Sequence, residues 1–129
     1  MRKIHVSTDK SYEVTVGHHL DTYIAKSIPN RVNQIAIIHA PIMKENAQNL
    51  VAEIARQNSD VHCHLIAAPD AELAKTFDFL QTSWNILGEL KFTRSDLIIS
   101  LGGGATTDVA GFVAASWLRG ISVIHIPTT

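Results

Sequence analysis

Three consecutive glycines, Gly102-Gly103-Gly104, follow an apolar run at Leu97–Leu101 and precede a predicted helix. Glycine lets the backbone approach a ligand closely, and the N-terminus of the following helix offers free N–H groups and a partial positive charge. This arrangement favours a bound pyrophosphate, although the spacing differs from the G-x-G-x-x-G dinucleotide motif. The alternative is a tight strand-to-helix turn capped by Thr106 or Thr107. Asp108 is either an acceptor for a bound nucleotide or an ordinary acid of the first helical turn.

A second group of polar residues, Asp70, Glu72 and Lys75, follows the strand predicted at Val61–Ile66. Glu72 and Lys75 are three positions apart, so on a helix they share a face and can form an ion pair. The pair is either an exposed salt bridge of small energetic value or a place where a carboxylate accepts ribose hydroxyls. Its position directly after the end of a strand supports the second interpretation.

Other polar residues follow later elements. Arg119 is either a cation that complements the end of a helix or a ligand for phosphate. Thr128 and Thr129 come after a predicted strand, where their hydroxyls either reach a ligand or form a simple turn. His62 and His64 share one face of a strand, but no further ligands complete a tetrahedral set, so no metal site is predicted.

The elements that must position these residues alternate between strands and helices. The predicted strands are Ile4–Ser7, Glu13–Val16, Gln34–His39, Val61–Ile66, Leu97–Leu101 and Ser122–Ile126. The first two form an N-terminal β-hairpin, and the others are separated by helices. The pattern predicts an α/β fold with a Rossmann-like, mostly parallel sheet and helices on both faces. Ligands of such sheets bind at the carboxyl ends of the strands.

The predicted helices carry apolar residues three and four positions apart. They cover Leu20–Ile28, Ile42–Arg56, a segment opening at Pro69-Asp70 with Gly88 as its C-cap, and a segment from the glycines to about Leu118 with Gly120 as its stop. The third helix is expected to bury a stripe composed of Leu73, Phe77, Leu80, Trp84 and Leu87.

The composition limits the class of protein. The chain has 129 residues, of which 46% are hydrophobic and 18% charged, and this suits one globular domain. A net charge of -1 without a basic run argues against nucleic-acid binding. No apolar run approaches the roughly 20 residues that span a membrane. Cys63 is the single cysteine, and Met1–His5 does not read as a signal peptide, so a cytoplasmic location is expected.

Taken together, these motifs resemble the dehydroquinate synthase family. The matching segments are Leu101–Gly104, Asp108–Phe112, Arg119-Gly120, Ile126–Thr129 and, upstream, Pro69–Lys75. Trp117–Gly120 and His39-Ala40-Pro41 are similar to actinobacterial members in particular. Ala71 and Thr107 stand where glycine is common in the family.

The resemblance implies an NAD-binding domain of an enzyme that converts DAHP (3-deoxy-D-arabino-heptulosonate 7-phosphate) into 3-dehydroquinate and phosphate in the shikimate pathway. NAD acts there as a catalytic cofactor. The cofactor-binding residues implied are Asp70, Glu72, Lys75, Gly103, Gly104, Asp108, Thr128 and Thr129. Arg119 resembles an arginine that reaches across a homodimer towards the substrate phosphate.

In the family, a lysine-bearing loop and the ligands of a zinc or cobalt ion follow the segment that matches Ile126–Thr129. We therefore expect residues 1–129 to be the N-terminal NAD-binding domain, without the C-terminal metal and substrate domain, without catalytic or metal-ligating residues of its own, and inactive alone. The alternatives are a related sugar phosphate cyclase, a metal-dependent glycerol-type dehydrogenase, and a non-catalytic nucleotide-binding module.

Overall fold

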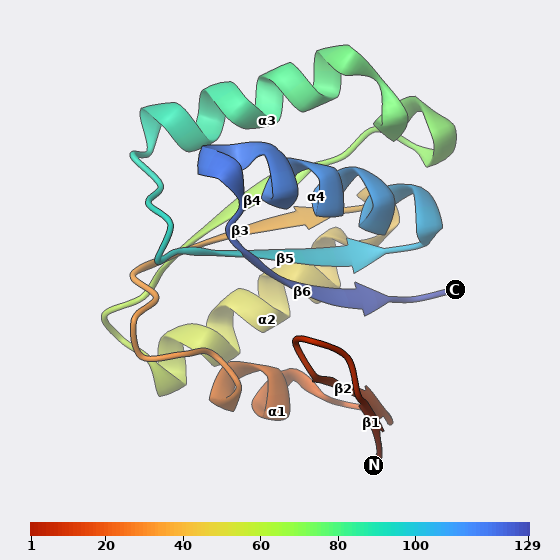
Figure 1. Ribbon diagram of the computed structural model, residues 1–129, viewed down its shortest axis with the longest axis vertical. Helices are drawn as coiled ribbons and strands as arrows, with labels where there is room; N and C mark the ends of the chain where they lie inside the picture. Colours follow the sequence, from red (N-terminus) through yellow and green to blue (C-terminus); the bar gives the residue numbers. More distant parts are fainter.

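Four parallel strands form the central sheet of the molecule (Figure 1). The computed structural model describes residues 1–70, 72 and 74–129. The strands are β3 (Gln34–His39), β4 (His62–Ala67), β5 (Leu97–Gly102) and β6 (Ser122–Pro127), in the order β4-β3-β5-β6. All six residues of β5 are buried, which is typical of a parallel strand covered on both faces.

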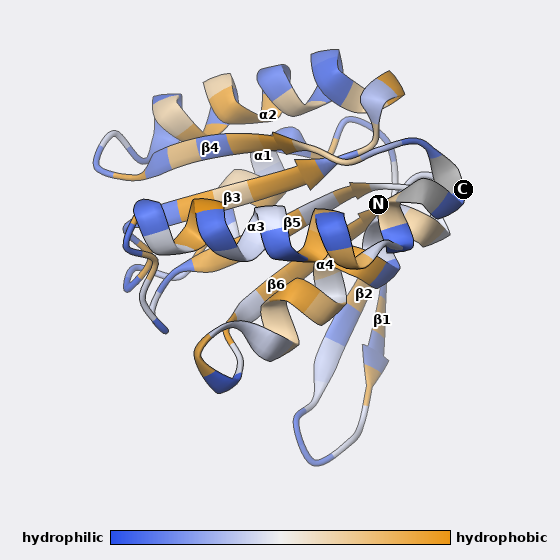
Figure 2. Cartoon of the chain, turned by 90° about the horizontal axis from the view of Figure 1, so that it is seen from above, coloured by the Kyte–Doolittle hydropathy of each residue, from blue (hydrophilic) through white to orange (hydrophobic). Residues whose placement is uncertain are grey.

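Helices cover both faces of this sheet, as the sequence predicts (Figure 1). Helices α1 (Asp21–Lys26) and α2 (Lys44–Gln57) pack on one face, and α3 (Phe77–Glu89) and α4 (Gly104–Ser116) pack on the other. Alternate strand residues therefore enter two separate cores. The core under α1 and α2 contains Ile35, Ile37, Leu97, Ile99 and Leu101, and the core under α3 and α4 contains Ala36, Ile38, Ile66 and Ile98. Hydrophobic residues follow the strands, whereas the helices mix polar and apolar residues (Figure 2).

The strand order identifies the edge at which a ligand is expected. The chain passes from β3 to β4 on one side and returns to β5 on the other side of β3. In doubly wound sheets with this order, ligands bind outside the carboxyl ends of the strands at this reversal. A hydrogen bond joins the ends of β3 and β5 at this reversal, because the Ala40 amide donates to the Leu101 carbonyl at 2.9 Å.

The N-terminal hairpin is confirmed as a separate antiparallel ribbon of β1 (Arg2–Val6) and β2 (Tyr12–Val16). Short 3-10 helices occur at η1 (Pro41–Met43), η2 (Ala71–Lys75) and η3 (Trp117–Arg119). Among the described residues, no helix is both long and apolar enough to cross a membrane.

The single helix predicted from Pro69-Asp70 is wrong, because the chain breaks at Thr76. This residue is extended (φ -101, ψ 152), and its hydroxyl accepts from the Phe79 amide at 3.2 Å, so α3 starts afresh. The predicted stripe is confirmed at Leu87, which is buried, and at Leu80, which packs against the core, but it is wrong at Phe77, which is 67% exposed. Phe79 and Ser83, which are not in that stripe, are buried instead. Gly88 lies inside α3, and Leu90 is the C-cap. Leu73 lies outside the described residues.

Helix α4 ends at Ser116, two residues earlier than predicted, and η3 follows. Leu118 (φ 48), Arg119 (φ 65) and Gly120 (φ 116) all have left-handed backbone angles. Gly120 is the C-cap of η3, whereas Trp117 is the C-cap of α4, so the predicted glycine ends the short helix that follows and not α4 itself.

Candidate functional site

The glycine loop joins β5 to α4, and each glycine meets a different environment. A Cβ added to Gly102 would lie 2.7 Å from the Thr106 hydroxyl, so no larger residue fits there. At Gly103 it would lie 3.1 Å from the Thr129 hydroxyl. A Cβ on Gly104 would meet no atom within 4 Å, so this residue faces open space. The first two glycines serve close packing, whereas the third borders a place where a ligand can approach.

The N-terminus of α4 is available to an anion. Gly103 is its N-cap, and within the part of the chain that the structure describes no side chain caps this end and no acidic residue occupies the first turn. The predicted cap by Thr106 or Thr107 is wrong: Thr106 is buried against Gly102, and the Thr107 hydroxyl donates to the Gly104 carbonyl at 3.1 Å. The first amides of α4 therefore carry their partial positive charge towards the open space beside Gly104.

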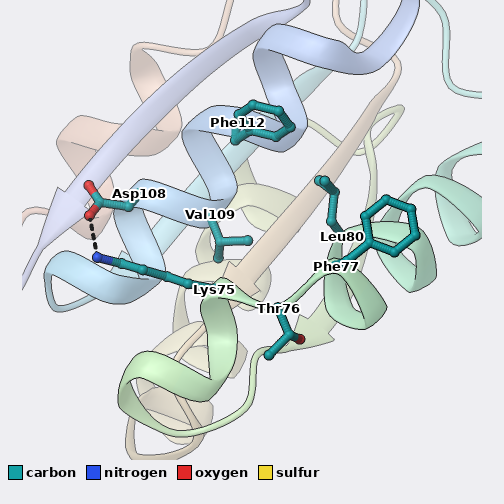
Figure 3. A pocket seen from close by; sticks show the side chains of 7 residues that line it. All are labelled: Lys75, Thr76, Phe77, Leu80, Asp108, Val109 and Phe112. Carbon is teal, nitrogen blue, oxygen red and sulfur yellow. Dashed lines mark ion pairs between the residues drawn. The ribbon is translucent and has the colours of Figure 1, made fainter.

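Lys75 connects the two groups of charged residues that the sequence singles out (Figure 3). Its ammonium lies 3.0 Å from the Asp108 carboxylate and 3.5 Å from that of Glu72. The Asp108 carboxylate, followed by Glu72, raises the pKa of Lys75. All three side chains are exposed, at 41%, 65% and 81% for Lys75, Asp108 and Glu72, so the pairs add little stability. Their polar groups remain accessible to a ligand.

Thr128, Thr129 and Asp70, which are also predicted to bind the cofactor, lie at or near the edge of the sheet formed by the carboxyl ends of the strands. The Thr128 amide donates to the Gly102 carbonyl at 2.9 Å, and this bond holds the end of β6 beside the loop. Thr129 places its hydroxyl next to Gly103. Asp70 is exposed and immediately precedes η2. Ala71 stands where the family commonly has glycine, and it lies outside the described residues.

Arg119 lies elsewhere. It follows the end of α4, and this helix of 13 residues is about 20 Å long, so the arginine and the glycine loop are at opposite ends. Its side chain is exposed. Arg119 therefore does not join the glycine-loop site of its own chain.

Three of the seven histidines make polar contacts within the fold. His39 is 2% exposed at the end of β3, and its Nδ1 lies 2.9 Å from the Ala40 carbonyl. His125 pairs through Nδ1 with the buried Ser100 hydroxyl at 2.6 Å. His64 bonds Gln34 at 2.9 Å. Within residues 1–70, 72 and 74–129, no group of histidine, cysteine and acidic residues is arranged to hold a metal ion.

A cavity of about 410 Å³ beside the Lys75–Asp108 pair was not anticipated from the sequence (Figure 3). It lies between the start of α3 and the outer face of α4. Its lining residues are Lys75, Thr76, Phe77, Leu80, Asp108, Val109 and Phe112. The break at Thr76 creates it, because the predicted continuous helix would have turned Phe77 into the core.

Comparison with known proteins agrees with this geometry. Residues 65–129, which include β5, the glycine loop and α4, match the family described as 3-dehydroquinate synthase N-terminal. The 3-dehydroquinate synthase of Corynebacterium pseudotuberculosis is 48% identical over 100% of this chain and 36% of its own length. That of Mycobacterium leprae is 39% identical over 98% of this chain and 34% of its own length. The chain thus spans about a third of the length of these relatives.

Solved structures share the fold. A 2-deoxy-scyllo-inosose synthase complexed with carbaglucose-6-phosphate, NAD+ and Co2+ superimposes with a TM-score of 0.86 at 23% identity, over 99% of this chain and 35% of that one. A 2-epi-5-epi-valiolone synthase from Streptomyces hygroscopicus with NAD+ and Zn2+ bound superimposes with a TM-score of 0.74 at 22% identity. The match covers 98% of this chain and 35% of that one. The family match over half of the chain, supported by relatives that align along its whole length, shows that this chain belongs to the 3-dehydroquinate synthase family.

Proposed function

We propose that this chain is the NAD-binding part of a 3-dehydroquinate synthase that converts DAHP into 3-dehydroquinate and phosphate. One observation carries the proposal: the uncapped N-terminus of α4 opens beside Gly104, and Asp108 on the same helix pairs with Lys75 of η2. The relatives that bear this name support the reaction, and the sugar phosphate cyclases of the same fold that hold NAD+ support the cofactor.

The residues present fit a dinucleotide. The first amides of α4, after its N-cap Gly103, would hold the pyrophosphate, for which Gly104 leaves room. Asp108 and Glu72 would accept ribose hydroxyls, and Lys75 would hold both carboxylates in place. Asp70, Thr128 and Thr129 would supply further polar contacts at the same edge. When bound, NAD supplies reversible oxidation of a ring hydroxyl, which permits phosphate elimination.

The rest of the reaction would depend on groups outside this chain. We assign the divalent metal, zinc or cobalt, and the catalytic residues to the part of the relatives that this chain does not cover. Arg119, far from the loop of its own chain, would serve the substrate phosphate of the other protomer in a homodimer. The chain alone is expected to be inactive on DAHP, and the reaction is expected in the cytoplasm.

The experiment is phosphate release from DAHP by the full-length natural protein, with NAD+ and divalent metal added or withheld. Release that requires both supports the synthase. The 129-residue chain, assayed in parallel under the same conditions, should release none. Absence of release from a folded, metal-loaded protein would reject the assignment of this substrate.

A second candidate is a sugar phosphate cyclase that forms another carbocycle. The observation in its favour is that the solved structures with this fold make 2-deoxy-scyllo-inosose and 2-epi-5-epi-valiolone. Supplying other sugar phosphates in the same assay distinguishes the two candidates, because only the correct substrate is turned over.

A further inference from the structure

The turn that follows α4 holds its backbone in an unfavourable conformation. Leu118 (φ 48), Arg119 (φ 65) and Gly120 (φ 116) are successive residues with left-handed angles. Glycine tolerates such angles, whereas the Cβ atoms of Leu118 and Arg119 crowd the neighbouring carbonyl oxygens. Backbone strain of this kind persists only where the surrounding structure enforces it, and it is concentrated at functional sites.

Two anchors enforce the turn, one on either side. On the side of α4, Trp117 packs against the core under α3 and α4, and its indole Nε1 donates to the Phe92 carbonyl at 3.3 Å. Its ring lies over Gly88 of α3, where an added Cβ would be 3.6 Å from the ring. On the side of β6, the Ile121 amide donates to the Ala114 carbonyl at 2.9 Å. The backbone between the anchors therefore has little freedom.

This turn presents the side chain of Arg119 to solvent. The side chain is exposed, and within the part of the chain that the structure describes no carboxylate forms an ion pair with it. A guanidinium suits a phosphate, because its planar set of N–H donors matches the phosphate oxygens. Ordering a flexible arginine on an anion costs conformational entropy, and a backbone that is already fixed lowers this cost.

We propose that Trp117 is a positioning residue for Arg119 and acts on the substrate phosphate only through it. The inference rests on the proposed function, which gives Arg119 the phosphate of the substrate held by the other protomer. The indole hydrogen bond to Phe92 and the packing over Gly88 hold the turn in one geometry, so the guanidinium reaches the phosphate from a fixed base. The glycine loop lies at the other end of α4, about 20 Å away, so this role is separable from cofactor binding.

The test is steady-state phosphate release from DAHP by the full-length natural protein loaded with NAD+ and metal. Trp117→Phe keeps an aromatic ring but removes the N–H that donates to the Phe92 carbonyl. We expect KM for DAHP to rise about fivefold and kcat to stay within about twofold, because the phosphate is held less well in the ground state and the transition state alike. The affinity for NAD+ and the melting temperature should not change.

Trp84→Phe is the matched control. It makes the same substitution at the other tryptophan of residues 1–129, whose Nε1 donates to the Ser116 hydroxyl at 3.0 Å instead of anchoring the turn. We expect this variant to keep the original KM for DAHP. An increase in KM that is no larger for Trp117→Phe than for Trp84→Phe would overturn the positioning role.

A double-mutant cycle with Arg119→Ala distinguishes positioning from a general structural effect. Arg119→Ala alone should raise KM for DAHP about tenfold or more, and Trp117→Phe should add nothing in that background. An equal increase in both backgrounds, or an unchanged KM in Arg119→Ala, would overturn the positioning role while the synthase activity stands. Absence of phosphate release from the unmodified, metal-loaded protein would instead reject the proposed function, and this role with it.

Discussion

Lys75 is the residue at which two parts of the candidate site meet. Its contacts to Glu72 and Asp108 join η2 to the first turns of α4. The sequence predicts each charged group separately, and it predicts the Glu72–Lys75 pair from spacing. It does not predict the 3.0 Å contact to Asp108, because that contact depends on how η2 packs against a helix distant in sequence.

Replacing Lys75 with methionine tests this junction. Both acids would lose the shared cation that holds them in place for a ligand. We expect the affinity for NAD+ to fall by roughly tenfold or more, while thermal stability changes little because the pairs are exposed. Lys10→Met, in the turn between β1 and β2, is the control and should bind normally. Equal affinity of Lys75→Met and Lys10→Met for NAD+ would show that Lys75 forms only an ordinary surface salt bridge.

A substitution at Gly104 distinguishes an effect on NAD+ binding from an effect on folding. Its added Cβ meets no atom within 4 Å, so Gly104→Ala should fold as well as the original chain or better, since alanine favours helix. The methyl group would nevertheless occupy the space through which a pyrophosphate approaches. We predict at least roughly tenfold weaker NAD+ binding by calorimetry, with an unchanged or higher melting temperature. Unaltered binding would exclude close approach of the ligand at this glycine.

At the scale of elements, the start of α3 decides the shape of the cavity. Thr76 interrupts the helix predicted from Pro69-Asp70, and this break exposes Phe77. Helical spacing alone favoured one continuous stripe, since Leu80, Trp84 and Leu87 continue it. The competing signal was the N-cap preference of threonine, and the structure shows that this local hydrogen bond prevails.

Thr76→Ala should therefore destabilise α3. The Phe79 amide would lose the hydroxyl that accepts its hydrogen bond at 3.2 Å. The expected cost is about 1 kcal/mol in the free energy of unfolding, measured by urea denaturation. Thr76→Ser keeps the hydroxyl and should retain most of the stability. A variant with serine as unstable as the one with alanine would indicate that the methyl group, not the cap, matters.

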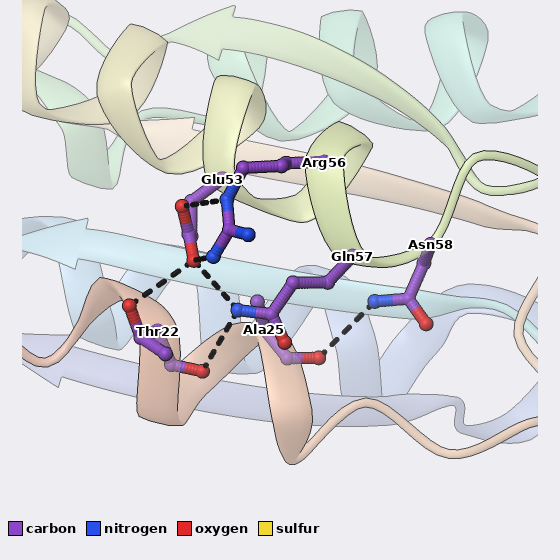
Figure 4. Close-up of polar contacts among 6 residues, drawn as sticks. All are labelled: Thr22, Ala25, Glu53, Arg56, Gln57 and Asn58. Carbon is purple, nitrogen blue, oxygen red and sulfur yellow. Dashed lines mark hydrogen bonds and ion pairs between the residues drawn. The ribbon is translucent and has the colours of Figure 1, made fainter.

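Helices α1 and α2 are linked by a polar cluster around Glu53 (Figure 4). Its carboxylate accepts from Arg56 at 2.6 Å, Gln57 at 2.6 Å and Thr22 at 3.1 Å. These bonds, that from Arg56 first, lower the pKa of Glu53 from 4.5 to about 2. Because the pKa is lowered on folding, the carboxylate stabilises the chain fully above pH 4.5, and this contribution is lost as the pH falls towards 2.

Glu53→Gln should remove this acid-sensitive contribution. The variant should unfold more easily than the original chain at neutral pH, and the difference should shrink between pH 4.5 and about 2. Denaturant titrations at several pH values measure it. Glu13→Gln, on the hairpin, provides the control for loss of a carboxylate elsewhere. A difference that stays constant over this pH range would contradict the role assigned to Glu53.

At the scale of the whole molecule, the alternation of apolar strands and helices was sufficient to predict the parallel sheet, its two helical layers and the hairpin. The bounds of β3 agree with the prediction residue by residue, because a buried run ends sharply at polar residues on both sides. The strand order β4-β3-β5-β6 was not predicted, although the polar residues of β4 and β6 distinguish these two edge strands from the buried strands β3 and β5. That order brings the glycine loop and the end of β6 to one edge, and so it determines which predicted residues share a site.

Calorimetric titration of NAD+ into the 129-residue chain and into Gly104→Ala tests directly whether the glycine loop holds the cofactor. We expect saturable binding of one NAD+ by the original chain and clearly weaker binding by the variant, with both proteins equally folded. No binding by the folded original chain, or equal binding by the two proteins, would contradict the claim that the glycine loop and α4 hold the cofactor.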